Sequence, residues 1–122
     1  MENPVSFNNT KKIGQQGEAL ALHFLQKQKL KLIKKNYCTR MGEIDLIMRD
    51  QSTYVFIEVR LRKNPTHGHS FETITHPKQQ RIINTAKHFL LSHNLYDQVD
   101  CRFDVIGIEE NQNIVWIQDA FQ

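Results

Sequence analysis

The chain has 122 residues, of which 39% are hydrophobic, and its 16 basic and 13 acidic side chains leave a formal net charge of +3. This length and composition are enough for one compact domain but not for two. The sequence has no run of eighteen apolar residues, and its first residues lack the layout of a signal peptide. We therefore expect a cytoplasmic protein without a membrane partner. A positive charge this small suits a polyanionic partner but identifies none.

Residues 1–10 are polar and predict a flexible lead-in to a single domain at residues 11–122. An apolar stripe over residues 11–28 predicts the first helix. Gly14 and Gly17 lie in its first turns, where each costs about 1 kcal/mol of helix propensity. They indicate either the close approach of another backbone or a ligand, or a later start of the helix.

A basic run at residues 30–37 and four apolar runs at residues 42–49, 54–62, 101–108 and 113–118, bounded by turn residues, predict five strands. Pro77 opens a second helix that extends to about residue 93. The order is helix, three strands, helix, two strands. This order predicts an α/β fold with a mixed sheet flanked by helices.

The second and third predicted strands both carry acidic side chains. Because strand side chains alternate between faces, Glu43 and Asp45 share one face, as do Glu58 and Arg60. If the hairpin is symmetric about residues 51–52, Asp45 lies opposite Glu58, and Glu43 lies opposite Arg60. Opposed carboxylates repel each other, which indicates a divalent cation between Asp45 and Glu58.

Phosphodiester hydrolysis needs a metal, an activated water and a group that stabilises developing negative charge. Asp45 and Glu58 can ligate Mg²⁺ or Mn²⁺, with the Val59 carbonyl as a third oxygen where the strand ladder is open. Arg60 would point toward the same phosphate, but it stays protonated and cannot act as a general base. The alternative is a solvated hairpin in which Arg60 forms an ion pair with Glu43.

Five blocks of the sequence resemble, in order and spacing, the YraN-like bacterial proteins. The blocks are Gly17-Glu18-Ala19, Gly42 to Ile47, Val55 to Arg60, Pro77 to Arg81, and Arg102 to Val105. The resemblance covers about residues 11–121. That family resembles the restriction-endonuclease-like PD-(D/E)xK nucleases and is similar in layout to archaeal Holliday-junction resolvases. The resemblance implies a restriction-endonuclease-like fold and a metal-dependent endonuclease site acting on structured or branched DNA.

The resemblance also implies a role for individual residues. Glu18 would be an outer acidic residue of the catalytic site, Asp45 and Glu58 the metal ligands, and Arg60 would stand in the position of the catalytic lysine. Arginine at that position departs from the usual pattern. Either it keeps the phosphate-binding charge while hydrolysis proceeds, or the protein binds DNA without cutting it. A third reading is a protein-interaction domain on the same fold.

Basic residues near the predicted site favour contacts with DNA phosphates, although a solvated surface would have the same composition. The residues are Arg60, Arg62, Lys63, Lys78 and Arg81. Duplex or branched DNA is the expected partner, RNA is an alternative, and a homodimer would bring one site to each strand. Asp104, between two apolar strand residues, is expected to be structural.

Overall fold

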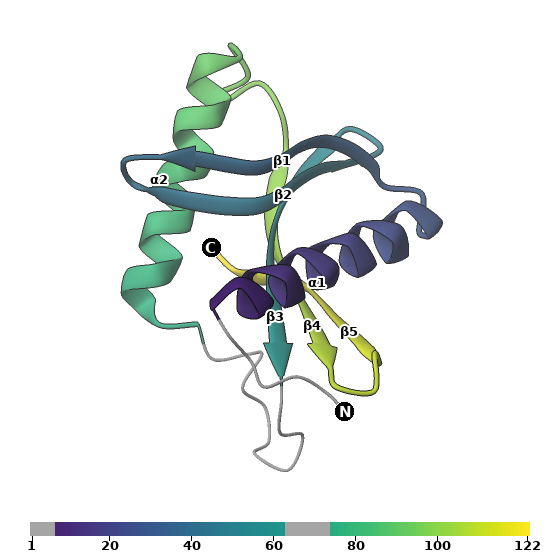
Figure 1. The fold of residues 1–122 in the computed structure, drawn as a ribbon. Helices are drawn as coiled ribbons and strands as arrows, with labels where there is room; N and C mark the ends of the chain where they lie inside the picture. Colours follow the sequence, from purple (N-terminus) through teal and green to yellow (C-terminus); the bar gives the residue numbers. More distant parts are fainter. Residues whose placement is uncertain (1–6, 63–73) are drawn as a thin grey trace.

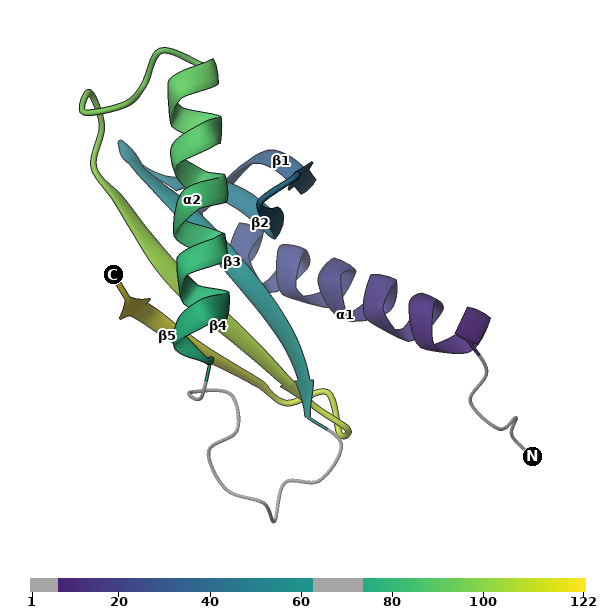
Figure 2. The same ribbon diagram turned by 90° about the vertical axis from the view of Figure 1, so that its left-hand side faces the viewer.

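The computed structural model describes residues 7–62 and 74–122. It is a five-stranded sheet with one helix on each face (Figure 1, Figure 2). The elements are α1 (Phe7–Lys27), β1 (Lys31–Thr39), β2 (Gly42–Asp50), β3 (Thr53–Arg62), α2 (His76–Ser92), β4 (Cys101–Glu109) and β5 (Ile114–Phe121). Strands β3 and β4 pair in parallel, and the other neighbouring strands pair antiparallel. The predicted α/β fold, mixed sheet and element order are confirmed.

Helix α1 begins at Phe7, four residues before its expected start at residue 11, so the suggested later start is wrong. Gly17 marks a close approach instead, because a Cβ added there would lie 2.8 Å from Leu61 Cδ2 on β3. Nothing lies within 4 Å of the same position at Gly14. Glycine at residue 17 therefore lets α1 lie against β3. Neither of the two described helices has the length and apolar content needed to cross a membrane.

The two faces of the sheet build two hydrophobic cores. On one face, Ala21 and Leu25 of α1 pack with Leu46 of β2. On the other, α2 packs with Ile44 of β2 and Phe56 of β3. The helices therefore cover opposite faces of the sheet, and the first residues of β2 lie between them.

Strand β2 changes faces at Asp45. Ile44 belongs to the core under α2 and Leu46 to the core under α1, although strand residues two apart normally share a face. Asn36 lies opposite Asp45 in the β1–β2 register and has a left-handed φ of 53°. The β1–β2 ribbon therefore turns over at this level.

The β2–β3 hairpin has the predicted register. Asp50 pairs with Thr53 and Leu46 with Ile57, which is symmetric about residues 51–52. The pairing stops at Leu46 and Ile57, because β2 turns over at the next residue. Asp45 and Glu58 are therefore not a pair within the ladder, and this part of the prediction is wrong. The two acids lie instead where the strands separate.

Asp104 of β4 is fully buried and links β4 to β5. Its carboxylate accepts hydrogen bonds from Arg102 Nε at 3.1 Å, Trp116 Nε1 at 2.9 Å and the Asp119 backbone N–H at 2.9 Å. Arg102 also reaches Asp50 of β2 at 3.1 Å. These contacts agree with the expected structural role of Asp104.

We predict that Asp104→Ala lowers the free energy of unfolding by about 3–5 kcal/mol, because it leaves buried donors, including the Arg102 charge, without this acceptor. Urea denaturation followed by circular dichroism measures the change. Glu110→Ala, in the exposed turn between β4 and β5, is the control and is expected to change stability by less than about 0.5 kcal/mol. Equal stability of the two variants would contradict the prediction.

Candidate active site

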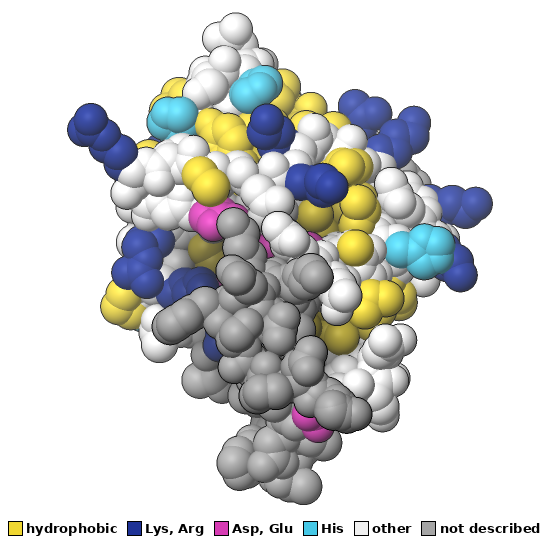
Figure 3. All heavy atoms as spheres, viewed as in Figure 1, with side chains coloured by type: hydrophobic (Ala, Val, Ile, Leu, Met, Phe, Trp, Pro, Cys, Tyr) yellow, Lys and Arg dark blue, Asp and Glu magenta, His cyan; other side chains and the backbone are white. Residues whose placement is uncertain are grey.

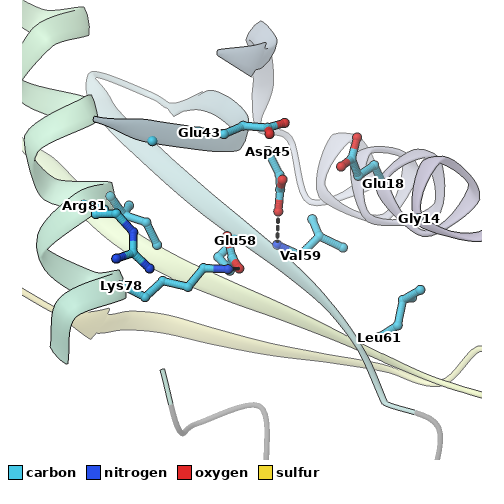
Figure 4. Close-up of a pocket in the computed structure, with 11 residues that line it drawn as sticks. Gly14, Glu18, Glu43, Asp45, Glu58, Val59, Leu61, Lys78 and Arg81 are labelled. Carbon is cyan, nitrogen blue, oxygen red and sulfur yellow. Dashed lines mark hydrogen bonds and ion pairs between the residues drawn. The ribbon is translucent and has the colours of Figure 1, made fainter. Parts of the chain in front are cut away.

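A cleft of about 510 Å³ opens where β2 separates from β3. Figure 4 shows it between α1 on one side and the first turns of α2 on the other. The charged side chains that line it are Glu18 of α1, Glu43 and Asp45 of β2, Glu58 of β3, and Lys78 and Arg81 of α2. Acids from three elements therefore face cations from a fourth.

Asp45 lies at the point where the strands separate. Its Oδ2 accepts a hydrogen bond of 2.8 Å from the backbone N–H of Val59, drawn as a dashed line in Figure 4. The carboxylate thus satisfies a β3 donor that β2 no longer pairs with. Because the N–H and C=O of one strand residue point to the same side, the Val59 carbonyl also faces the cleft.

Asp45 is held in an environment that disfavours its charge. Burial, followed by the charge of Glu58, raises the pKa of Asp45 to about 7, although the hydrogen bond from Val59 lowers it. Glu18 and Glu43 add smaller repulsive contributions. A cation bound in the cleft would relieve this repulsion.

Glu18 and Glu43 are joined through Asn36. In the amide orientation that satisfies both acids, Asn36 donates to Glu18 Oε1 at 3.0 Å and to Glu43 Oε2 at 3.2 Å. Burial raises the pKa of Glu18, and its hydrogen bond with Asn36 opposes that shift. The structure therefore brings Glu18 to the cleft with Asp45, and it adds Glu43 and Asn36, which sequence reasoning did not assign to the site.

Glu58 is the most buried acid of the cleft, with 8% of its surface exposed. Lys78 Nζ lies 2.9 Å from Glu58 Oε2. Thr75 caps α2 by accepting a hydrogen bond from the Lys78 backbone N–H, and Pro77 lies in the first turn. The cap and the proline fix the start of α2 at His76. Lys78 therefore lies in the first turn, where its side chain reaches Glu58.

Gly42 sets how closely α2 approaches β2. A Cβ at this position would lie 3.2 Å from Thr85 Oγ1 and 3.4 Å from Arg81 Cβ. A larger residue would press against α2, so glycine permits the packing that turns Arg81 into the cleft. Arg81 has no carboxylate partner within the described ranges and can bind an anion.

Arg60 does not line the cleft, although it follows Glu58 by two residues on β3. Among the residues with described positions, no ion pair joins Arg60 to Glu43, so the pairing suggested by the hairpin register is wrong. Arg62 ends β3, and Lys63 lies outside the described residues. The cation beside Glu58 is Lys78, which the sequence indicated only as a contact for DNA phosphates.

The donors in the cleft suit a hard divalent cation. Asp45, Glu58 and the Val59 carbonyl offer only oxygen, which Mg²⁺ and Mn²⁺ prefer. Within residues 7–62 and 74–122, no three His, Cys, Asp or Glu side chains are arranged to hold a metal by themselves. Two carboxylates are nevertheless sufficient for Mg²⁺, which usually keeps several waters and shares substrate phosphates. The residues therefore fit a cation that binds together with its substrate.

The charge distribution around the cleft is uneven. Figure 3 shows acidic side chains near the centre of this face, with Lys and Arg side chains gathered to either side. The flanking cations would attract an anion, and the central acids would repel it. A metal ion bound among the central acids would offset their repulsion of the anion.

Fold and cleft together define a mixed α/β protein with a carboxylate-lined site at the division of its sheet. The model of the uncharacterised protein family UPF0102 matches residues 17–108, and the chain belongs to that family. The predicted resemblance to the YraN-like bacterial proteins is thereby confirmed.

Relatives in several bacteria match along most of their length. The chain is 48% identical over 116 residues to a UPF0102 protein of Coxiella burnetii, covering 95% of this chain and 97% of that protein. It is 54% identical over 106 residues to one of Psychromonas ingrahamii, covering 86% and 85%. It is 43% identical over 113 residues to one of Legionella pneumophila, covering 92% and 96%.

We predict that Asp45→Asn stabilises the metal-free protein at pH 8. The folded state raises the pKa of Asp45 from 3.8 to about 7, so ionised Asp45 opposes folding. This destabilisation grows as the pH rises from about 4 to about 7 and is complete above that range. Asparagine removes the charge and keeps an acceptor for the Val59 N–H.

Urea denaturation in EDTA at several pH values from 5 to 8 tests this expectation. The stability difference between wild type and Asp45→Asn should shrink as the pH falls. Glu110→Gln, at an exposed acid of the β4–β5 turn, is the matched control and should follow the wild type. A wild type more stable than Asp45→Asn at pH 8 would contradict the prediction.

Proposed function

We propose that this protein is a Mg²⁺- or Mn²⁺-dependent endonuclease that acts on structured or branched DNA in the cytoplasm. The observation that carries the proposal is one cleft in which Asp45 and Glu58 face Lys78 and Arg81. Phosphodiester hydrolysis needs oxygen ligands for a hard cation and positive groups for the phosphate. The resemblance of the sequence to PD-(D/E)xK nucleases supports the same reaction.

The acidic residues divide into an inner and an outer group. Asp45 and Glu58 would hold the metal through carboxylate oxygens, with the Val59 carbonyl beside them. When bound, the ion polarises the phosphate and lowers the pKa of water. Glu18 and Glu43, tied to Asn36, would form the outer group and orient water around the inner one.

Lys78 takes the role that the resemblance gave to Arg60. Its Nζ lies 2.9 Å from Glu58 Oε2, so it stands next to a proposed metal ligand. A lysine ammonium has three donors, so Lys78 can keep its ion pair with Glu58 and also donate a hydrogen bond to a phosphate oxygen. This bond would stabilise the negative charge that develops in the transition state. Arg81, one turn further along α2, would bind the phosphate through its planar guanidinium.

Arg60 is proposed to contact DNA outside the cleft, and Arg62 and Lys63 are proposed as further DNA contacts. Two other functions compete with nuclease activity. A protein that binds DNA without cutting it is favoured by the absence of lysine at residue 60. A protein-interaction domain would use the same charges for a protein partner. A homodimer, with one cleft for each strand, is compatible with the first two.

Cleavage assays test the reaction. With labelled duplex, flap and four-way-junction DNA, the wild type is expected to cut at least one substrate in Mn²⁺ and none in EDTA. Glu58→Ala should abolish cleavage, because it removes a metal ligand. Lys78→Gln is expected to slow cleavage by about 10²–10³-fold, and Arg60→Gln by less than about tenfold, because Arg60 acts outside the cleft.

Lys87→Gln is the control, because Lys87 is an exposed residue of α2 outside the cleft. Binding without cleavage by any form of the protein would favour the DNA-binding alternative. Neither binding nor cleavage would favour the protein-interaction domain. An RNA substrate cut in place of DNA would keep the site and change the substrate.

Metal binding can be measured apart from cleavage. We predict that Mg²⁺ or Mn²⁺ stabilises the wild type, by about 1.4 kcal/mol at a concentration ten times its Kd. Asp45→Asn should lose this response, because its amide cannot replace the carboxylate ligand. Thermal unfolding with and without metal measures the effect, and Glu110→Gln should respond as the wild type does. An equal response in Asp45→Asn would exclude Asp45 as a ligand.

A further inference from the structure

A second groove, of about 310 Å³, runs between α1 and β1. It meets the cleft at Glu18, which lines both. Its other polar side chains are Gln15, His23, Gln26, Lys35 and Asn36. The groove therefore leads away from Asp45 and Glu58, and its polar lining consists mainly of amides and an imidazole.

Lysines are concentrated beside this groove. Five of the nine residues from 27 to 35 are lysine, and none of the nine is acidic. We call Lys27, Lys29, Lys31, Lys34 and Lys35 the lysine strip. All five are exposed, and within the described part of the chain none forms an ion pair. Figure 3 shows Lys and Arg side chains gathered over the end of α1 and the start of β1.

The strip is positive on both faces of an edge strand. Lys35 pairs with Leu46, whose side chain lies in the core under α1. Lys34 pairs with Ile47, whose side chain lies in the core under α2. A backbone passing along β1 therefore meets positive charge from either side.

Positive charge without acidic partners attracts a polyanion. Arg81 supplies such charge on the α2 side of the cleft, beside Lys78, which is paired with Glu58, and the lysine strip supplies it on the α1 side. A phosphodiester backbone that crosses the acidic centre would meet cations before and after it. The positive charges therefore extend the possible binding surface for a phosphodiester backbone beyond the cleft.

The groove itself favours an unpaired strand. In a duplex the Watson–Crick edges of the bases are occupied, whereas a single strand can present them to protein side chains. Gln15 and Gln26 offer amide donors and acceptors for such edges, and Asn36, whose N–H groups bind Glu18 and Glu43, offers its carbonyl oxygen. His23 offers a ring on which a base can stack.

We propose that the groove between α1 and β1, with the lysine strip, binds a single-stranded extension of the nucleic acid whose phosphodiester lies in the cleft. This inference rests on the proposed function. It gives the site a substrate class, a duplex that carries an unpaired strand. The phosphates of that strand contact the lysine strip, and its bases enter the groove.

Edge protection is the competing explanation for the lysines. Lysines on an exposed edge strand prevent pairing with the edge of another molecule, and β1 is an edge of the sheet. That explanation predicts self-association when the lysines are removed, and no change in nucleic-acid binding. The two explanations are therefore separable.

Fluorescence anisotropy in EDTA compares a blunt duplex with the same duplex carrying a single-stranded overhang. We expect the wild type to bind the overhang form about tenfold more tightly near 0.1 M salt. The triple variant Lys31→Gln, Lys34→Gln, Lys35→Gln should lose most of this preference. Its salt slope on the overhang form should fall by about two, because each single-strand phosphate contributes about 0.7.

Two further variants distinguish the contribution of the groove to binding from that of the lysine strip. His23→Ala should reduce the overhang preference and keep the salt slope, because it removes a ring and no lysine. Lys87→Gln, which removes one charge from α2, should keep both. Light scattering on the triple variant measures self-association in the same samples.

Equal binding of the two DNAs by the wild type would overturn this inference and leave the proposed nuclease standing. Self-association of the triple variant with an unchanged overhang preference would overturn it in favour of edge protection. A polyglutamate peptide that competes as well as the oligonucleotide would assign the strip to an acidic protein partner. Failure of the wild type to bind either DNA, both in EDTA and with Ca²⁺ in its place, would remove the proposed function, and this inference with it.

Discussion

The hydrogen bond from the Val59 backbone N–H to the Asp45 carboxylate is the interaction on which the site depends. A sheet can open in its interior only if the released backbone groups find partners, since an unpaired donor is costly. Asp45 supplies that partner at 2.8 Å, at the residue where β2 turns from one core to the other. The opening forms the cleft that Glu58 lines from β3 and Glu18 lines from α1. Without this bond, the Val59 N–H would have no partner where the ladder opens.

Two aspartates of one sheet illustrate how surroundings decide a role. Asp104 is fully buried, yet donors from Arg102 and β5 satisfy it, so its charge supports the fold. Asp45 has one backbone donor and several acidic neighbours, and its pKa is raised to about 7. Perturbed groups of this kind in a cleft are typical of functional sites. A cation bound beside Asp45 would relieve this destabilisation of the metal-free protein.

Helix α2 supplies the cation beside Glu58 that β3 does not provide. The resemblance places the catalytic cation two residues after Glu58, where this chain has Arg60, but the cation in contact with Glu58 comes from Lys78. The cap at Thr75 and the close packing at Gly42 put that lysine there. Charge at a reacting phosphate depends on position in space, and a helix can provide it as well as a strand. Membership of an uncharacterised family leaves the reaction itself a proposal.

Alternation of apolar residues and turn chemistry act over short distances. They were sufficient to predict the element order, the β2–β3 register and the proximity of Asp45 to Glu58. The start of α1 was missed, because Asn8, Asn9 and Thr10 have low intrinsic helix propensity and give no local helix signal. Only the tertiary structure decided that the ladder ends at Ile57 and that Lys78 replaces Arg60 beside Glu58. The first feature follows from the twist of β2 between the two cores. The second follows from the contact of α2, which is distant in sequence, with Glu58 of β3. No local pattern encodes either, because both arise when separate elements pack together.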